Sequence, residues 1–422
     1  MNQNKLIQSV KGTREFYPEE MTIRNFIYQN ARKASELFGF QEWDGPFLES
    51  IDLYAAKSGD ELVKEQSFVF PDRGGDLITL RPELTPSLAR MVAQRQNQLT
   101  YPLRWWSFGP FWRYERPQRG RSREFFQWNV DLIGPDSPLA DAEILAIGAT
   151  FLKLCGLKPE SAIILINNRK LMDQQFEKIG VPKEKRLEVS NAVDRRNKVT
   201  SEKWDENVLE IGLTDQQLNE LKETLANSEL WRESPELVEL FSILELMGLK
   251  EYVRFDPNIM RGLLYYTGTV FEAFDVSGSV KRAIFGGGRY NNLLSDVGGD
   301  PLSAVGFAMG DVVVGLILKE AGLIDLSAAL PAKVLVTVFE PNLLGASINV
   351  ATQLRDAGIN VIIYPETAKL PKQFKFADKI GSRFVLVIGP DEAEVGKVTV
   401  KDLLNATQRT IEVDELISSL QG

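Results

Sequence analysis

Two aromatic-rich segments joined by an arginine-rich loop restrict the fold of this chain more than any other feature. The segments "LRWWSFGPFWRYER" (103–116) and "REFFQWNVDLIG" (123–134) flank a loop centred on Gly120. Their composition and short connection predict two antiparallel strands. Two further strands around a Gly-Gly turn at 74–75 precede a helix predicted from about Pro86. Hairpins interspersed with helices predict an α+β fold with an antiparallel sheet, not a doubly wound sheet.

The remaining patterns divide the chain into parts. Amphipathic helices are predicted over 20–38 and 139–154, and residues 170–250 have the helical periodicity and charged faces of a helical insertion. The strands then resume and end in a helix from about Asp311 to Ala321, so residues 1–325 are predicted to form one domain. Residues 331–422 alternate buried-type strands with helical segments, which predicts a separate α/β domain with a mostly parallel sheet.

Composition excludes several kinds of chemistry. The chain of 422 residues has a net charge of −9, no histidine and one cysteine, Cys155. Ser-His-Asp and Cys-His catalysis, a histidine general base and a cysteine-rich zinc site are therefore excluded. Carboxylates, arginines, tyrosines and backbone groups remain, a set suited to positioning and electrostatic stabilisation. The apolar runs are strand-sized and the N-terminus has no signal-peptide core, so we expect a cytoplasmic protein without a membrane partner.

The arginine-rich segment from Phe111 to Asp131 holds five arginines in an acidic chain. Arg113 and Glu115 have the same strand parity, which predicts that both face one side of the sheet. Four further arginines surround Gly120, where forked guanidinium groups match phosphate oxygens. The following strand places a ring, amides and a carboxylate on one face: Phe125, Gln127, Asn129 and Asp131. A nucleotide with a second, amine-bearing ligand fits this pattern, and a solvated basic hairpin that contacts nucleic acid is the alternative. Taken alone, Arg113 and Glu115 fit a structural ion pair equally well.

Three other segments carry weaker signals. Glu83 and Thr85 precede a helix start, so they either cap the helix or present a polar pair to an ammonium group. "MRGLLYYTGTVFEAF" places Arg261 before two tyrosines, which in a strand point to opposite faces. "AIFGGGRYNNLL" has three glycines after a strand, where a ligand can approach the backbone closely. It is neither a P-loop nor a dinucleotide fingerprint.

Taken in order, these segments resemble the class II aminoacyl-tRNA synthetases, and among them the histidyl-tRNA synthetase family. "KGTREFYPEEM" is similar to the N-terminal signature of that family, and "GFQEWDGPFLES", with Pro46, resembles class II motif 1. "FWRYERPQRGRSREFFQWNVD" resembles motif 2, and "AVGFAMGD" the start of motif 3. "RGLLYYTGTVFE" and "GGGRYNNLL" are similar to the two histidine-specific motifs. The resemblance covers nearly the whole chain and implies a catalytic domain over 1–325 and an anticodon-binding domain over 331–422.

The resemblance also implies roles for individual residues. Arg113 and Arg261 would be catalytic, on opposite sides of the ATP α-phosphate and the histidine carboxylate. The residues implied to bind ATP are Arg113, Glu115, Arg121 and Phe125. Those implied to bind histidine are Glu83, Thr85, Gln127, Asp131, Arg261, Tyr265 and Tyr266. Those implied to contact tRNA are Arg119, Arg123, Lys372 and Lys375. Backbone around Gly287 and Gly306 would line the floor of the pocket.

The implied ligands and partners are ATP with Mg²⁺, L-histidine and tRNA(His), and the motif 1 resemblance implies a homodimer. No metal site formed by protein side chains is expected. The chain departs from the family pattern at three positions. Val313 stands where motif 3 carries an arginine for the terminal phosphate, and Leu264 stands where an aspartate is usual. Asp131 replaces the longer glutamate of the imidazole pocket.

Two alternative functions remain open at this point. Synthetase-like paralogues act as regulatory subunits of ATP phosphoribosyltransferase in histidine biosynthesis, although they usually resemble the catalytic domain alone. Another class II synthetase is the second alternative, disfavoured by the paired histidine motifs. For the tRNA partner, the spacing of Lys372, Lys375, Lys379 and Arg383 predicts a basic stripe if the segment is helical throughout. A solvated surface explains such a stripe equally well.

Overall fold

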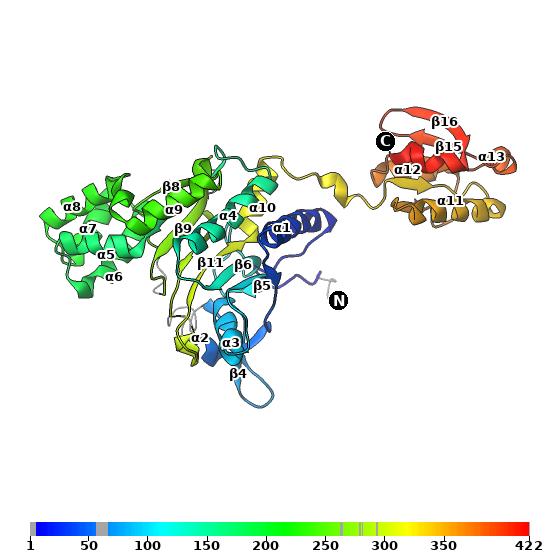
Figure 1. The fold of residues 1–422 in the computed structure, drawn as a ribbon. Coiled ribbons are helices and arrows are strands. Elements are labelled where there is room, and N and C mark those ends of the chain that lie inside the picture. Colours follow the sequence, from blue (N-terminus) through cyan, green and yellow to red (C-terminus); the bar gives the residue numbers. More distant parts are fainter. Residues whose placement is uncertain are drawn as a thin grey trace. The chain divides into compact units, whose positions relative to one another are not determined.

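The computed structural model describes residues 6–55, 66–261, 265–277, 280, 282–292 and 294–421. The chain divides into two compact units, residues 1–15 with 23–324 and residues 16–22 with 325–422. The first unit contains an eight-stranded sheet in the order β1-β5-β6-β11-β10-β9-β7-β8 (Figure 1). In that order its strands are Gln41–Glu42, Leu103–Trp112, Glu124–Gly134, Ser303–Gly310, Ala283–Arg289, Thr269–Asp275, Ala162–Asn168 and Val253–Phe255.

The pairing of these strands confirms the predicted antiparallel sheet. Every neighbouring pair from β5 to β7 is antiparallel, and only the edge strands β1 and β8 add in parallel. A smaller sheet has the order β2-β4-β3, with strands Leu48–Ser50, Leu77–Leu80 and Phe68–Pro71. The predicted hairpin around the Gly-Gly turn is therefore present as β3 and β4, and the hairpin around Gly120 as β5 and β6.

Helices cover one face of the large sheet because alternate strand residues on that face are apolar. Trp128 of β6 is fully buried and packs against Phe151 of α4 and Phe307 of β11, with ring centroids 5.1 and 4.9 Å away. Its indole N–H donates a 3.1 Å hydrogen bond to the hydroxyl of Ser35 on α1. The helices of this unit outside the insertion are α1 (Pro18–Leu37), which belongs to it from Ile23 on, α2 (Ile51–Ala55), α3 (Thr85–Arg95), α4 (Pro138–Leu154) and α10 (Asp311–Glu320).

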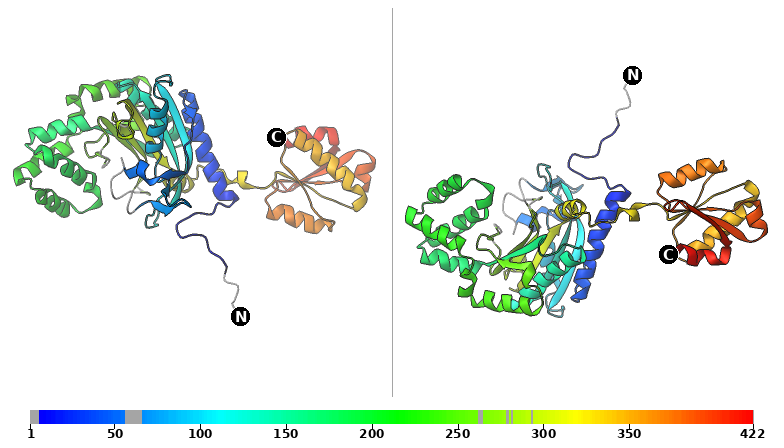
Figure 2. Two further views of the ribbon diagram at one scale, coloured as in Figure 1. Left: turned by 90° about the horizontal axis from the view of Figure 1, so that it is seen from below. Right: turned by 90° about the horizontal axis from the view of Figure 1, so that it is seen from above.

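The helical insertion lies between β7 and β8 in the sequence. Its helices are α5 (Arg169–Lys178), α6 (Arg186–Asp194), α7 (Ser201–Glu210), α8 (Asp215–Ala226) and α9 (Pro235–Leu246). Side-chain caps begin several of them; the Thr214 hydroxyl, for example, accepts from the Gln217 backbone N–H in a capping box. In both views of Figure 2 these green helices gather at one side of the unit. The polar side chains of the candidate site lie on the opposite face of the antiparallel sheet.

The second unit has a five-stranded sheet in the order β13-β12-β14-β15-β16. Its strands in that order are Val361–Ile363, Val334–Val336, Phe384–Val387, Lys397–Asp402 and Thr407–Glu412. Its helices are α11 (Leu344–Asp356), α12 (Leu370–Lys379), α13 (Pro390–Glu394) and α14 (Leu416–Gln421). The first three strands are parallel as predicted, but β15 and β16 form an antiparallel hairpin that was not anticipated. Strand β16 is polar and exposed along nearly its whole length, with Ile411 as its one apolar residue, so it lacks the buried-type pattern of the other strands.

The arginine of the "GGGRY" segment has a structural role. Arg289 is almost fully buried and forms a 2.5 Å ion pair with the buried Asp141 of α4. Its guanidinium also donates to the carbonyls of Pro135 and Ser137 at 3.0 and 3.2 Å. Burial raises the pKa of Asp141, and Arg289 opposes this shift. The pair therefore fastens the start of α4 to the end of β10.

We predict that Arg289→Met destabilises the catalytic unit by about 3–5 kcal/mol, because it leaves the Asp141 carboxylate buried without its partner. The double variant Arg289→Met/Asp141→Leu should recover part of this loss. Chemical denaturation checks both values, with Arg254→Met on the exposed side of β8 as the control. A single variant as stable as the wild type would contradict the structural role of Arg289.

Candidate active site

The floor of the candidate site consists of small residues on the face of the large sheet opposite the helices. Gly306 of β11 lies in register with Asp131 of β6 and with Gly288 of β10. A Cβ atom added to Gly306 would lie 2.5 Å from Oδ1 of Asp131, and one added to Gly288 would lie 2.8 Å from the Tyr266 ring. Only glycine leaves room at these two positions for the side chains above them.

The backbone around Gly287, which was expected to line the pocket floor, alternates between the two faces of the sheet. Gly287 is in register with Phe307, which belongs to the hydrophobic core, so this glycine faces the core side. Because side chains alternate along a strand, its neighbours Gly286 and Gly288 face the site instead. Gly306 lies where the sequence placed it.

Asp131 and Tyr290 form a buried acid–phenol pair. The Tyr290 hydroxyl donates a short hydrogen bond to the Asp131 carboxylate, and both side chains are more than nine-tenths buried. Burial raises the pKa of Asp131 to about 7, although the Tyr290 hydrogen bond lowers it. Burial also raises the pKa of Tyr290, so its phenol keeps its proton near neutral pH. A ligand here would meet a carboxylate that can accept an N–H group.

Tyr265 and Tyr266 complete the wall beside this pair. Their ring centroids lie 4.7 Å apart, and the Tyr265 ring meets that of Tyr290 edge-on at 6.1 Å. The sequence had suggested a strand with its tyrosines on opposite faces. That suggestion is wrong, because both residues precede β9 and lie outside any strand, which lets their rings pack together.

Arg261 lies over the glycine floor and faces a carboxylate that the sequence motifs did not identify. Its Nη1 atom is 2.9 Å from Oε1 of Glu272 on β9, and its guanidinium is 5.6 Å from the centre of the Tyr266 ring. The Arg261 backbone has φ of 47°, which is uncommon for a residue with a side chain. The Arg169 guanidinium donates to the Arg261 carbonyl at 3.1 Å and helps to hold this conformation.

Arg113 and Phe125 form the second half of the site at the end of the β5–β6 hairpin. The Arg113 guanidinium lies 5.3 Å from the centre of the Phe125 ring, and Nε donates to the Pro82 carbonyl at 2.9 Å. The Phe125 ring stacks on Phe111 at 5.9 Å. Phe125 therefore presents an aromatic surface with an arginine beside it.

The strand-parity argument for Arg113 and Glu115 does not hold. Strand β5 ends at Trp112, and the Glu115 N–H donates a 2.7 Å hydrogen bond to the Arg113 carbonyl in a tight turn. Glu115 instead forms a 2.6 Å ion pair with Arg121. The two side chains reach the site from a turn, not from one face of a strand.

Two other loop arginines, Arg119 and Arg123, each have a partner of their own. Arg119 pairs with Glu320 at the end of α10. The Arg123 guanidinium lies 4.0 Å from the centre of the Tyr114 ring and donates to the Glu115 carbonyl at 3.1 Å. The arginines that are clustered in the sequence therefore interact with different partners in the structure.

Three further polar residues are implied for the amino-acid pocket, namely Glu83, Thr85 and Gln127. Helix α3 begins at Thr85, and its N-cap residue is Leu84, which makes no side-chain cap. The charge of Glu83 adds to the upward pKa shift of Tyr265, whose main cause is burial. Gln127 faces the site from β6, in register with Gly109 and Gly310.

Of the three departures from the family pattern, Asp131 is described above and Val313 lies on α10. Val313 is nearly buried in the first turn of α10. Beside it, Asp311 accepts from Arg14 and from the Phe126 backbone N–H, both at 2.8 Å, so it holds the N-terminal segment against β6. Leu264 lies outside the described residues.

The predicted tRNA-contact lysines lie in the second unit. Lys372 and Lys375 are exposed on α12, and Lys372 pairs with Glu366. The stripe is shorter than predicted, because α12 ends at Lys379 and Arg383 lies beyond it, 3.4 Å from Asp402.

Two residues of the site were missed by sequence reasoning, namely Tyr290 and Glu272. A signal for Tyr290 existed, because alternation from Gly286 through Gly288 points to it on the same face. Glu272 lies in the quoted segment "TGTVFEAF", in register with Gly286, but only the paired strands reveal this.

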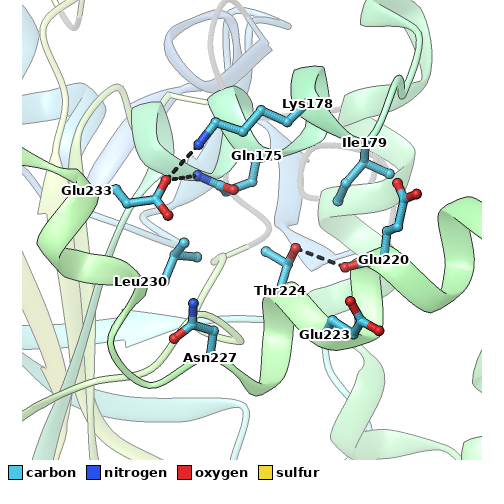
Figure 3. A pocket seen from close by; sticks show the side chains of 9 residues that line it. All are labelled: Gln175, Lys178, Ile179, Glu220, Glu223, Thr224, Asn227, Leu230 and Glu233. Atoms are coloured by element: carbon cyan, nitrogen blue, oxygen red, sulfur yellow. Dashed lines mark hydrogen bonds and ion pairs between the residues drawn. The ribbon is translucent and has the colours of Figure 1, made fainter.

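A separate cavity of about 310 Å³ lies in the helical insertion (Figure 3). Glu233 accepts there from Lys178 at 2.6 Å and from Gln175 at 3.0 Å. The lining residues are Gln175, Lys178, Ile179, Glu220, Glu223, Thr224, Asn227, Leu230 and Glu233. They include none of the residues implied for catalysis or binding.

Metal-binding clusters and membrane spans are both absent from the part of the chain that the structure describes. Its residues contain no group of three or more Cys, Asp or Glu side chains placed to hold a metal ion. Within the same residues, no helix combines the length and apolar character needed to cross a bilayer.

The antiparallel sheet has one helix-covered face, and a site of arginines, carboxylates and tyrosines lies on the other. Together with the C-terminal α/β unit, these features define a class II aminoacyl-tRNA synthetase. The family model described as "Histidyl-tRNA synthetase" matches residues 12–311, and the model described as "Anticodon binding domain" matches residues 333–422. The chain belongs to the histidyl-tRNA synthetase family.

Full-length relatives support this assignment. The chain is 38% identical to a chloroplastic/mitochondrial histidine–tRNA ligase of Arabidopsis thaliana, over 96% of this chain and 85% of the relative. It is 34% identical to the histidine–tRNA ligase of Leptospira biflexa, over 100% and 99%. The crystal structure of histidyl-tRNA synthetase from Nostoc sp. PCC 7120 superposes with a TM-score of 0.86 at 25% identity, covering 99% of both chains. The predicted family, fold class and ligase activity are confirmed, and the regulatory alternative has less support.

We predict that Asp131→Asn makes stability less dependent on pH. The folded-state pKa of Asp131 is raised from 3.8 to about 7, so the folded protein binds the proton more tightly than the unfolded chain. Its unfavourable contribution therefore grows from about pH 4 to pH 7 and approaches about 4 kcal/mol above that range. Denaturation at pH 5 and pH 8 should show a larger decline for the wild type than for the variant. Equal declines would contradict the raised pKa.

Proposed function

We propose that the site forms histidyl-adenylate from ATP and L-histidine and that the protein then transfers histidine to tRNA(His). The observation that carries this proposal is the buried Asp131–Tyr290 pair, beside Tyr265 and Tyr266 on a glycine floor. This arrangement matches imidazole, because the Asp131 carboxylate, held by Tyr290, would accept from a ring N–H and the Tyr265 phenol would donate to the other nitrogen. A side chain without these nitrogens would leave buried polar groups unpaired, which can give about 10⁴-fold discrimination.

Glu83, Thr85 and Gln127 are proposed to bind the α-amino group of histidine. Glu83 supplies the negative charge that an ammonium group requires, and it lies close enough to Tyr265 to influence its pKa. With its α-amino group bound in this way, the substrate would direct its carboxylate toward Arg113 and Arg261. The imidazole and the ammonium group would then fix both ends of the substrate.

The ATP site is proposed at the end of the β5–β6 hairpin. The Phe125 ring would stack on adenine, and Glu115 would accept from the adenine amino group after releasing Arg121. Arg113 would bind the α-phosphate, with Arg261 on the opposite side, across the histidine carboxylate. Mg²⁺ is proposed to arrive on the ATP phosphates, because the described residues offer no set of carboxylates for it.

The reaction needs charge compensation more than proton transfer. An oxygen of the histidine carboxylate forms a bond to the α-phosphorus, and the bond from that phosphorus to the bridging oxygen breaks. The electron pair leaves with pyrophosphate. Arg113 and Arg261 offset the repulsion between the two anions, which accords with a chain that contains no histidine.

For the partners, Arg119, Arg123, Lys372 and Lys375 are proposed to contact tRNA(His), the first two at its acceptor end. We propose a homodimer in the cytoplasm. Support for the dimer comes from large apolar side chains exposed around the β2-β4-β3 sheet, which are Phe47, Leu48, Val69, Phe70 and Leu77. Sedimentation equilibrium should give twice the 47.4 kDa chain mass, and a single-chain mass would contradict the dimer.

Histidine-dependent exchange between ATP and pyrophosphate tests the function. We expect exchange with histidine and not with other amino acids, and a loss of about 10²–10³-fold in kcat for Arg113→Ala or Arg261→Ala. Arg254→Ala, on the exposed side of β8, is the matched control. Absence of exchange by the wild type at saturating substrate would reject the enzyme and favour the regulatory alternative. Exchange with a different amino acid would favour another class II synthetase.

The tRNA surface has its own test. Reversing Lys372 and Lys375 to glutamate should weaken tRNA charging while leaving adenylate formation unchanged, because α12 belongs to the second unit. The control reverses Lys397 and Arg409 on the β15–β16 hairpin. Charging and exchange rates are measured for both double variants. Loss of both steps together in the α12 variant would argue against a tRNA contact.

A further inference from the structure

Arg282 is a cation of the catalytic unit that neither the sequence motifs nor the proposed site uses. It directly precedes β10 and is partly buried. Among the residues that the structure describes, no carboxylate lies within ion-pair distance of its guanidinium. A partly buried arginine without a partner is unfavourable in the ligand-free protein, so an anionic ligand is a reasonable source of compensation.

The tip of the β5–β6 loop lies directly on this arginine. A Cβ added to Gly120 would be 3.2 Å from Cδ and 3.6 Å from Nε of Arg282. The same point is 3.7 Å from Cγ2 of Val313 on α10. Arg282 and Val313, an apolar residue of α10 that supplies no charge, thus both border the tip of the loop.

A second guanidinium and a single carboxylate complete this cluster. Arg121, next to Gly120, pairs with Glu115 at 2.6 Å. Burial and the charge of Arg121 both lower the pKa of Arg282, and Glu115 opposes them. Two positive charges therefore share one negative charge, which leaves the cluster with a net positive charge. Such an arrangement is suited to an anion with several oxygens.

The identity of the anion rests on the proposed function. The adenine ring and its amino group are assigned to Phe125 and Glu115, and the α-phosphate to Arg113 and Arg261. The outer phosphates are the anionic part of ATP that remains. When adenine occupies Glu115, Arg121 loses its carboxylate and both guanidinium groups become available.

We propose that Arg282 binds the outer phosphates of ATP together with Arg121, and so holds the pyrophosphate leaving group on the Val313 side of the site. As the bond to the α-phosphorus breaks, negative charge accumulates on the bridging oxygen of that group. A guanidinium already in place stabilises this charge without reorganisation. Arg282 therefore contributes to ATP binding and to catalysis.

The experiment compares Arg282→Met, Arg282→Lys and the control Arg254→Met in histidine-dependent ATP–pyrophosphate exchange. Arg282→Met should raise KM for ATP about tenfold or more and lower kcat, while KM for histidine changes little. Arg282→Lys should have an intermediate KM for ATP, because lysine keeps the positive charge but lacks the forked guanidinium group. Inhibition by AMP, which lacks the outer phosphates, should stay the same in all variants.

An unchanged KM for ATP in Arg282→Met would overturn the proposal. Equal weakening of ATP and AMP would also overturn it, because Arg282 would then act on the adenosine or the α-phosphate. Thermal unfolding with tripolyphosphate separates this outcome from failure of the proposed function. Even if the wild type showed no exchange, tripolyphosphate should raise its Tm and should have a smaller effect on Arg282→Met; equal effects would contradict the role of Arg282.

Discussion

The register between β6, β11 and β10 determines most of the candidate site. It sets Gly306 between Asp131 and Gly288, so that the carboxylate and the Tyr266 ring occupy space that a side chain would fill. A shift of one residue would turn Asp131 toward the core and Val130 toward the ligand, because alternate residues face opposite sides. The aromatic packing of Trp128 on the covered face opposes such a shift.

The site brings several charges together, and most of them have a defined neighbour. Asp131 has the Tyr290 hydroxyl, and Arg261 has Glu272. On the nucleotide side Glu115 has Arg121. Breaking such contacts is unfavourable unless a ligand provides equivalent ones, so these pairings favour a substrate with matching groups. A histidine-free chain can use this arrangement because the reaction depends on charge stabilisation.

The tertiary structure also distinguishes structural arginines from functional ones. Arg289 is engaged by carbonyls and a carboxylate within the fold. Arg113, Arg261 and Arg282 lie where substrate phosphates are proposed. Sequence position does not separate the two groups, since Arg282 directly precedes β10 and Arg289 ends it.

The sequence by itself determined the antiparallel hairpin, the helical insertion, the parallel part of the C-terminal sheet and the family, because periodicity and motifs are local properties. It also identified Asp131, Arg113 and Arg261. Only the tertiary structure decided that Tyr290 and Glu272 complete the site, that Tyr265 and Tyr266 pack together outside a strand, and that Arg282 lies under Gly120. Those contacts join segments far apart in the chain, and strand pairing and turn geometry create them.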